Sequence, residues 1–392
     1  MSTDHKIALI AITPNGVKLA EKLQKKLASG DLYVSPKLIE NKNDSESNSI
    51  ENQDCPESQT QETAIYSITP SLSVLTEELF KNYDILIFIM ATGIVVRTIA
   101  PYLKDKFSDP GVLVLDELGQ NIISLLSGHM GGANEMTLRV SKLLGANPVI
   151  TTSTDVNDKA ALDNIAKVLD ASITDFREAV KEINYSLVQG KKIGLYQEYD
   201  YKIDTRGFII LKSLENLIKQ EDLDNQGNLV NEECLDNKED LGKFEKIVCI
   251  TYKKKLEIET DKIIKVIPKD LVLGIGCRKD TPIELLEKSF DSFLEAYNID
   301  YRAIKCLGSV EVKVHEEAII ALAKKLAVPF KTVTREEIAT VDNLFERSEF
   351  VKKNIGVYSV AEPAAYLLSG GNLWIGKHKY QGITFAIGRI KA

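Results

Sequence analysis

The chain has 392 residues, of which 44% are hydrophobic and 27% charged, so it is long enough for two to three domains and apolar enough to bury a core. It contains no run of eighteen apolar residues and no signal-peptide pattern at its start, so we expect neither a transmembrane helix nor secretion. Five scattered cysteines without a CxxC pair predict neither a zinc site nor a disulfide framework, and a reducing cytoplasm is the expected location.

The net charge of −8 is unevenly distributed along the sequence. Residues 41–62 carry a local charge of −5 and residues 221–240 one of −7, and both stretches are rich in polar residues and poor in aromatic ones. This composition predicts acidic surface insertions at 41–62 and 219–245. The remaining chain has a charge of about +4, which permits an anionic small molecule but is too weak and too dispersed for nucleic acid.

Strand and helix patterns alternate through the first 150 residues, which indicates layered α/β structure. Short apolar runs predict strands, and apolar residues spaced three and four apart predict helices. The expected strands are residues 7–12, 31–36, 64–68, 84–91, 111–116, 121–126 and 147–150, and the expected helices are residues 13–27, 71–80, 94–103 and 134–144. Residues 117–120 form a short turn that favours a hairpin between the two strands beside it.

The rest of the chain divides into a less regular middle and a second regular α/β region. The middle has expected helices at 158–169 and 174–190 and expected strands at 191–199, 207–211 and 244–252. From residue 271 a buried strand, a glycine turn and a helix follow, then further helices and two closing strands between 372 and 390. We therefore predict a multidomain α/β protein with an N-terminal domain (1–150), a small middle domain (151–268) and a C-terminal domain (269–392).

The stretch LLSGHMGGANEM places His129 between glycines, just before a helical pattern. Gly128, Gly131 and Gly132 would let the backbone bend and let a ligand approach amide hydrogens closely. The helix start favours negative charge there, and Asn134 is its expected N-cap. His129 can act as an acid, a base or a hydrogen-bond donor near neutral pH. The alternative is a tight turn in which the histidine only bonds a backbone carbonyl.

Two further strand-to-helix transitions carry candidate binding residues. In ATGIVVRTIAP, Thr92 can cap the helix, Gly93 can expose amides and Arg97 can reach an acidic group, although a capped helix with a solvated arginine explains the same pattern. In GIGCRKDTPIE, Arg278 and Lys279 lie beside glycines, where they can bind carboxylates. Both transitions are therefore candidates for holding an anionic ligand.

Several other patterns favour structural roles. Thr281 with Glu284 and Ser359 with Glu362 have capping-box spacing, and Cys277 follows a buried strand, so these residues are expected to be structural. No GxSxG elbow, GxGxxG fingerprint or Walker loop is present. The four histidines are far apart in sequence, so a protein-bound catalytic metal is not expected.

Three stretches together resemble one family. The chain resembles the cobalt-precorrin-5A hydrolase (CbiG) family of anaerobic cobalamin synthesis. The resemblance lies in MATGIVVRTIAP, in SLLSGHMGGANE and in the C-terminal stretches LVLGIGCRKDTP, SVAEPAA and GITFAIGRI. The resemblance covers nearly the whole chain except the two insertions, and the C-terminal part also resembles the small CobE-type proteins of the aerobic pathway. One departure is SVEVKVHEE, where the family has a Ser-x-Asp-x-Lys-like stretch: Glu311 lengthens the acid, and Lys313 is kept.

The resemblance implies a specific reaction. Water opens the δ-lactone of a cobalt-containing tetrapyrrole, cobalt-precorrin-5A, to give cobalt-precorrin-5B, and a two-carbon fragment leaves as acetaldehyde. Cobalt would arrive with the substrate, so no cofactor is expected. We assign His129 as the catalytic acid or base, with a broad cleft between domains for the macrocycle. The expected substrate-binding residues, which offer oxyanion donors or hold the carboxylate arms, are Thr92, Gly93, Arg97, Gly128, Gly131, Gly132, Asn134, Arg278 and Lys279.

Two other functions fit the same sequence. The protein could carry the tetrapyrrole without catalysis, in which case no acetaldehyde would be released. It could also be a nucleotide-using α/β enzyme, although the missing phosphate-binding motifs count against this. Neither a nucleic-acid partner nor a membrane partner is expected, and a homo-oligomer is left open.

Overall fold

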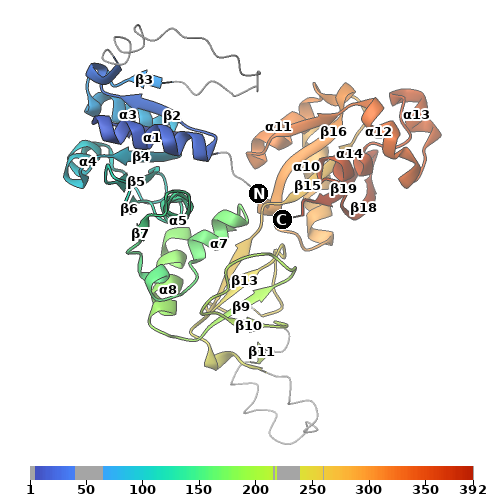
Figure 1. Cartoon of the computed structure of the whole chain (residues 1–392). Coiled ribbons are helices and arrows are strands. Elements are labelled where there is room, and N and C mark those ends of the chain that lie inside the picture. The colour runs from blue at the N-terminus through green and yellow to red at the C-terminus, as the bar shows by residue number, and fades with distance from the viewer. Residues whose placement is uncertain (1–4, 40–64, 215–216, 219–238, 259, 392) are drawn as a thin grey trace, which may run out of the picture. The chain divides into compact units, whose positions relative to one another are not determined.

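The computed structural model describes residues 5–39, 65–214, 217–218, 239–258 and 260–391 (Figure 1). The expected insertion at 41–62 and most of the one at 219–245 lie outside the described residues. The chain folds as two compact units, Met1–Asp158 and Lys159–Ala392. The described part of the first unit contains one sheet, and that of the second contains two five-stranded sheets and one small two-stranded sheet.

Unit one is built on a seven-stranded sheet with the order β3-β2-β1-β4-β5-β6-β7. Its strands are β1 (Ile7–Ala11), β2 (Asp31–Val34), β3 (Ile65–Ser67), β4 (Ile85–Ile89), β5 (Gly111–Leu115), β6 (Asn121–Leu126) and β7 (Asn147–Val149). Its helices are α1 (Pro14–Leu27), α3 (Leu72–Asn82), α4 (Thr92–Ile99), η1 (Ala100–Tyr102), α5 (Ala133–Leu144) and α6 (Ser153–Val156). All neighbouring strands are parallel except β5 and β6, which form the expected hairpin.

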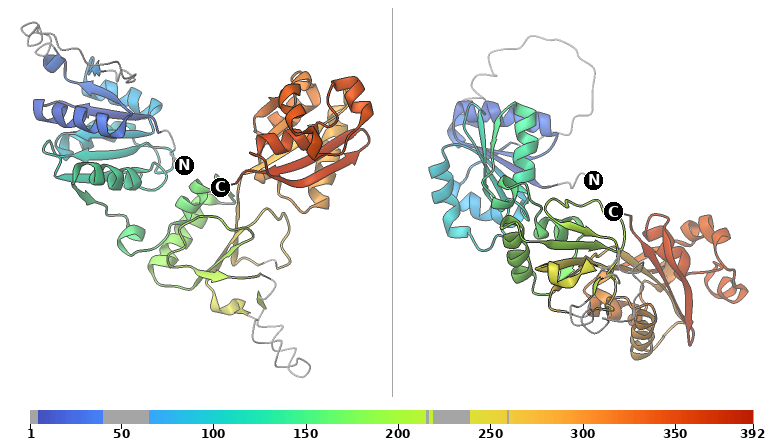
Figure 2. Two further views of the ribbon diagram at one scale, coloured as in Figure 1. Left: turned by 45° about the vertical axis from the view of Figure 1, so that its right-hand side comes forward. Right: turned by 90° about the horizontal axis from the view of Figure 1, so that it is seen from below.

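Both faces of this sheet are buried, which explains why β1 and β4 are apolar at every position. Alternate residues point to opposite faces of a strand. Ile85, Ile87 and Ile89 of β4 pack in one core cluster with residues of α1 and α5, whereas Leu86 and Phe88 pack in another with residues of α3 and α4. Helices accordingly lie on both faces of the sheet (Figure 2). This is the layered α/β arrangement that the alternating pattern predicted.

The first part of unit two surrounds a five-stranded sheet with the order β10-β9-β13-β14-β8, in which only β8 is antiparallel. The strands are β8 (Ser172–Ile173), β9 (Ile193–Gln197), β10 (Ile209–Leu211), β13 (Lys246–Ile250) and β14 (Ile263–Ile267). They are accompanied by α7 (Leu162–Val168), α8 (Phe176–Val188), η3 (Leu241–Lys243) and the two-stranded β11 (Leu217–Ile218) with β12 (Glu239–Asp240). The observed α7, α8, β9, β10 and β13 coincide with predicted elements.

The second part of unit two has the sheet order β17-β16-β15-β19-β18. Three parallel strands, β15 (Leu271–Gly276), β16 (Ile304–Val310) and β17 (Phe330–Val333), are extended by the antiparallel β19 (Ile383–Arg389) and β18 (Leu373–Tyr380). The helices are α10 (Ile283–Ala296), η4 (Tyr301–Ala303), η5 (Glu311–Lys313), α11 (Glu317–Leu326), α12 (Arg335–Val341), η6 (Asp342–Leu344), α13 (Glu349–Ile355) and α14 (Ala361–Leu368). Sequence patterns did not predict β14, β16 or β17.

The mixed α/β sheets confirm the predicted fold class. The expected domain boundaries at residues 150 and 268 stay predictions, because the contacts divide the chain only once, after Asp158.

Candidate active site

The His129 loop lies at the edge of the unit-one sheet where the parallel strands begin. Because β6 is antiparallel to β5, with Leu126 opposite Val112, the loop after Leu126 reaches the first residue of β5. β7 is parallel to β6 and ends at Val149 on the same edge. The residues that follow β7 therefore meet the His129 loop.

Close packing and backbone conformation explain the three glycines of this loop. A Cβ on Gly128 would lie 2.6 Å from Asn134 Oδ1, and a Cβ on Gly131 would lie 2.8 Å from both Gly111 N and Ser127 O. Gly132 has a φ of 80°, which side chains rarely adopt, and it is the N-cap of α5. The glycines thus allow the loop to close against β5 and α5 while His129 faces the residues after β7.

His129 is paired with Asp155. Its Nε2 lies 3.0 Å from Asp155 Oδ2 and 3.3 Å from Thr154 Oγ1. The imidazole is 9% exposed and the carboxylate 33% exposed, so the pair is accessible mainly from the Asp155 side. A histidine oriented by a carboxylate is the usual arrangement for proton transfer, with the carboxylate fixing the ring and stabilising its charged form.

Asn134 holds Asp155 rather than capping the helix. Its Nδ2 donates to Asp155 Oδ2 at 2.9 Å and to Thr152 Oγ1 at 3.0 Å, and its Oδ1 accepts from Ser124 Oγ at 2.6 Å. The predicted N-cap role is wrong, because Gly132 occupies that position. Asn134 was also a candidate for binding substrate. It is buried and bonded to three side chains, which fits a role in holding Asp155 in place better than direct contact with a ligand.

The amide of Gly132 does not fit the expected role of oxyanion donor. It donates to His129 O at 3.0 Å, and the amides of Ala133 and Asn134 donate to Ser127 O and Gly128 O. These amides at the start of α5 are therefore used inside the loop. The amide of Gly131 remains the candidate donor from the glycine motif.

Sequence reasoning missed Asp155, Thr154, Thr152 and Ser124. The residues after β7 read ITTSTD, and no functional role was predicted for them. These residues could have been placed beside His129 only by knowing that β7 pairs with β6 in the same direction. That pairing was not evident from the sequence pattern.

Thr92, Gly93 and Arg97 lie at the opposite edge of the same sheet. β4 and β5 are parallel, with Ile85 opposite Gly111, so the start of α4 follows the carboxyl end of β4. The Arg97 guanidinium donates to Gly93 O at 3.1 Å and is exposed, and Thr92 makes no capping hydrogen bond because Ala91 is the N-cap. The structure therefore does not bring these three residues together with His129.

Arg278 and Lys279 are exposed in the loop that follows β15. The predicted capping box in this loop is wrong: Pro282 is the N-cap of α10 and Glu284 accepts no capping bond. Instead, the Thr281 amide donates to Glu316 Oε1 at 3.2 Å, and Thr281 Oγ1 donates to Arg278 O at 2.8 Å. The carboxylate of Glu316, 35 residues away in sequence, thus binds Thr281 in place of the predicted Glu284.

The other structural candidates of unit two also have specific partners. Burial raises the pKa of the Cys277 thiol, which fits a core residue better than a nucleophile. Glu362 does not form the predicted cap, because Val360 is the N-cap of α14, and its Oε1 accepts from Lys377 N at 3.1 Å. Glu311 forms an ion pair with Arg335 at 2.9 Å.

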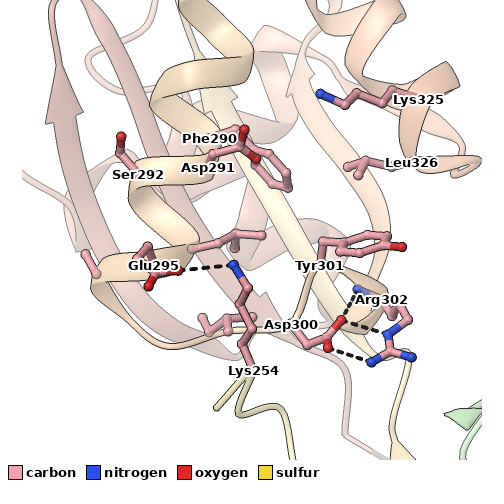
Figure 3. Close-up of a pocket in the computed structure, with 13 residues that line it drawn as sticks. Lys254, Phe290, Asp291, Ser292, Glu295, Asp300, Tyr301, Arg302, Lys325 and Leu326 are labelled. Atoms are coloured by element: carbon pink, nitrogen blue, oxygen red, sulfur yellow. Dashed lines mark hydrogen bonds and ion pairs between the residues drawn. The ribbon is translucent and has the colours of Figure 1, made fainter. Parts of the chain in front are cut away.

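A cavity of about 1140 Å³ lies at the amino edge of the last sheet, lined in part by Lys254, Glu295, Asp300, Tyr301 and Arg302 (Figure 3). Its lining carries three cations (Lys254, Arg302 and Lys325) and three carboxylates (Asp291, Glu295 and Asp300). Two of the cations form ion pairs within the pocket: Lys254 binds Glu295 at 3.1 Å, and Arg302 binds Asp300 at 2.8 Å. A pocket with internally neutralised charges is poorly suited to a polyanionic ligand. It also lies away from the carboxyl ends of β15 and β16, where α/β sheets usually bind ligands.

Across the described ranges, no group of three His, Cys, Asp or Glu residues is placed to hold a metal ion. None of the described helices is long and apolar enough to cross a membrane.

Comparison with known proteins covers most of the chain. Residues 74–155 match the family model "Cobalamin synthesis G N-terminal", residues 160–267 match "Cobalamin biosynthesis central region", and residues 271–388 match "Cobalamin synthesis G C-terminus". Over 103 residues, 26% of this chain and 66% of the relative, the chain is 32% identical to Protein CobE of Sinorhizobium sp.

Two relatives are similar along nearly their whole length. The chain is 38% identical over 387 residues to the cobalt-precorrin-5A hydrolase of Salmonella typhimurium, covering 97% of each chain. It is 30% identical over 392 residues to the cobalt-precorrin-5A hydrolase of Priestia megaterium, covering 98% of this chain and 94% of the relative. With this coverage and with all three family models matched in order, the chain belongs to the cobalt-precorrin-5A hydrolase (CbiG) family.

Proposed function

We propose that this chain hydrolyses cobalt-precorrin-5A, opening its δ-lactone to give cobalt-precorrin-5B with release of acetaldehyde, in anaerobic cobalamin biosynthesis. The observation that carries the proposal is the similarity to named cobalt-precorrin-5A hydrolases over nearly the full chain. The His129–Asp155 pair supports a hydrolytic role, because lactone opening needs a group that moves protons beside a position for the developing oxyanion.

In this proposal His129 takes a proton from the attacking water. Asp155 Oδ2 lies 3.0 Å from Nε2 and orients the ring for this transfer. The charged imidazolium that forms is stabilised by the adjacent carboxylate, which Asn134 keeps in place. His129 then returns the proton to the leaving oxygen, which opens the lactone and restores the base. The carbinol that forms then breaks its C–C bond to the macrocycle: its hydroxyl loses a proton, its carbon becomes the carbonyl carbon of acetaldehyde, and the macrocycle carbon takes up a proton, so that one water is consumed overall.

The oxyanion that develops on the lactone carbonyl requires a hydrogen-bond donor. We assign this role to the Gly131 amide, because the Gly132 amide is bonded to His129 O. Arg278 and Lys279 are proposed to hold the acetate and propionate arms, since their loop is exposed and cationic. Cobalt is carried by the substrate, and no resident cofactor is proposed.

The test is incubation of the purified chain with cobalt-precorrin-5A while acetaldehyde is measured. Hydrolysis predicts catalytic release, whereas a carrier protein would bind the macrocycle and release none. His129→Ala and His129→Gln should both lower turnover about a hundredfold or more while the macrocycle still binds. A Gln variant with near-normal release would make His129 a positioning donor, since glutamine donates a hydrogen bond but cannot shuttle a proton.

A further inference from the structure

Lys313 and Glu316 form a buried ion pair in the C-terminal part of unit two. The Lys313 Nζ donates to Glu316 Oε2 at 2.7 Å, and the two side chains are 7% and 6% exposed. They lie after the carboxyl end of β16, where η5 leads into α11. The neighbouring Glu311 of the same motif instead forms a more exposed pair with Arg335.

The buried pair joins two loops at the same edge of the sheet. β15 and β16 are parallel neighbours, so their following loops are adjacent. Glu316 uses Oε2 for Lys313 and Oε1 for the amide of Thr281. Thr281 in turn donates its hydroxyl to Arg278 O at 2.8 Å. A continuous series of hydrogen bonds therefore runs from Lys313 to the backbone of the loop that carries Arg278 and Lys279.

Stability alone is a weak explanation for such a pair. Removing two charges from water is costly, and apolar residues of similar volume often stabilise a fold equally well or better. The geometry here has a second consequence, because the carboxylate that Lys313 neutralises also accepts from the Thr281 amide. A fixed loop loses less conformational freedom when its cations bind a ligand, so the ligand binds more tightly.

We propose that Glu316, whose buried charge Lys313 neutralises, is a positioning residue for a carboxylate-binding subsite formed by Arg278 and Lys279. Its ligand is an acetate or propionate arm of the macrocycle, so the inference rests on the proposed function. The cations make the contact with the arm, and the buried pair sets the position of their loop through Thr281. The two residues have no part in proton transfer.

Two matched variants isolate the positioning hydrogen bond. K313M/E316Q and K313M/E316L both remove the buried charges, so neither leaves one charge unpaired. Only glutamine keeps an oxygen that can accept from the Thr281 amide. The dissociation constant for cobalt-precorrin-5A, followed by absorbance titration of the macrocycle, should rise about tenfold in the Leu variant, as for one lost hydrogen bond. It should stay within about threefold of wild type in the Gln variant, and kcat should change little in either.

A substrate-independent readout is alkylation of Cys277, which lies in the same loop and is partly buried. Peptide mapping should show faster alkylation at Cys277 in the Leu variant than in the Gln variant. E311Q serves as the control, because Glu311 pairs with Arg335 outside this series of bonds.

The outcomes separate the two ideas. Equal dissociation constants in the Gln and Leu variants overturn the positioning role, and faster alkylation without weaker binding overturns the carboxylate subsite. If the wild-type chain binds cobalt-precorrin-5A but releases no acetaldehyde, the proposed hydrolysis fails, whereas the two dissociation constants still decide this inference. If the wild-type chain does not bind the macrocycle, both are overturned.

Discussion

At the residue scale, Asp155 is the group that gives His129 a defined orientation. It lies 3.0 Å from Nε2 and is itself held by Asn134 at 2.9 Å. Fixing the ring orients it for the proposed proton transfer, and the carboxylate would offset the positive charge that forms on the ring in that step. We therefore expect Asp155 to affect turnover more than it affects binding of the macrocycle.

Asp155→Asn tests this division of roles. An amide keeps the size of the side chain but can present an N–H to the imidazole, which favours the wrong tautomer. We expect kcat to fall about 10²- to 10⁴-fold while the dissociation constant for cobalt-precorrin-5A changes less than about threefold. Glu135→Gln, on the exposed side of the same helix start, is the control and should leave both values near wild type. Full activity of the Asn variant would show that His129 acts without a carboxylate.

The glycines of the two N-terminal motifs differ in what a side chain would meet. A Cβ on Gly131 would lie 2.8 Å from Gly111 N and Ser127 O, whereas a Cβ on Gly93 would meet only Arg97 Nη1, at 3.4 Å. We expect Gly131→Ala to lower the free energy of unfolding by about 1–3 kcal/mol through overpacking. Gly93→Ala should be neutral or slightly stabilising, because alanine favours the helix. Urea unfolding of both variants measures the difference, and equal midpoints would contradict the close packing of the His129 loop.

At the element scale, the direction of β6 decides which residues share an edge. The apolar runs and the short turn at 117–120 were sufficient to predict the β5–β6 hairpin. Its consequence was not recognised: reversing the chain at the turn carries the His129 loop to the edge where β5 begins, away from Thr92. The motifs could be found in the sequence, but their spatial grouping depends on strand pairing between distant segments.

The capping predictions were wrong for a related physical reason. Asn134, Thr281 and Ser359 each have a residue type and spacing that favours a local hydrogen bond at a helix start. In the fold, Asn134 binds side chains of β6 and the residues after β7, and the Thr281 amide binds Glu316. Tertiary partners replaced the local ones, and sequence spacing carries no signal for partners more than a few residues away.

Asp116 stabilises the turn of the β5–β6 hairpin. Its Oδ1 accepts from the amides of Leu118 and Gln120 at 3.0 and 3.1 Å, and its Oδ2 accepts from the Asn121 amide at 2.6 Å. Burial by itself raises the pKa of this carboxyl, but the amide hydrogen bonds outweigh it, and the pKa is lowered from 3.8. Because the folded pKa is below the unfolded one, this stabilisation is present at neutral pH and is lost as the pH falls through the folded value.

Asp116→Ala should therefore destabilise unit one in a pH-dependent way. We expect a loss of about 1–3 kcal/mol at pH 7, since several backbone amides lose their acceptor. The difference from wild type should shrink as the pH falls below about 4, where the wild-type carboxyl becomes protonated. Urea midpoints at a series of pH values give the measurement. A difference that stays constant across this range would mean that the charge of Asp116 has no role.

At the scale of the whole molecule, an aromatic contact joins the two large sheets of unit two. Arg389, at the end of β19, lies with Cζ 4.0 Å from the ring centre of Tyr199 and 5.1 Å from that of Tyr201, which follow β9. Trp374 of β18 packs edge-on against Tyr199, with ring centres 6.0 Å apart. Cation–aromatic contacts of this kind contribute about 0.5–2 kcal/mol each. The two sheets are therefore expected to unfold together.

Asp270, between β14 and β15, is a buried carboxylate beside Arg389, so replacing Arg389 should also destabilise the fold through Asp270. Its Oδ1 accepts from the Tyr252 hydroxyl at 2.6 Å, and its Oδ2 lies 3.8 Å from Arg389 Nε with no hydrogen-bond partner among the described residues. Burial raises the pKa of this carboxyl. Removing Arg389 would leave a buried carboxylate without its nearby positive charge, which is one of the more destabilising changes a fold can undergo.

Arg389→Leu tests the contact directly, because Trp374, the single tryptophan of the chain, lies within it. We expect the thermal transition followed by tryptophan fluorescence to move down by about 5–10 °C, from lost aromatic contacts and the uncompensated carboxylate. Adding Asp270→Asn should recover at least about half of the shift, since it removes the buried charge. Arg335→Leu, whose side chain is half exposed, is the control and should move the transition little. If Arg389→Leu leaves the tryptophan transition unchanged, this contact does not couple the two sheets, and the middle and C-terminal parts are expected to unfold independently.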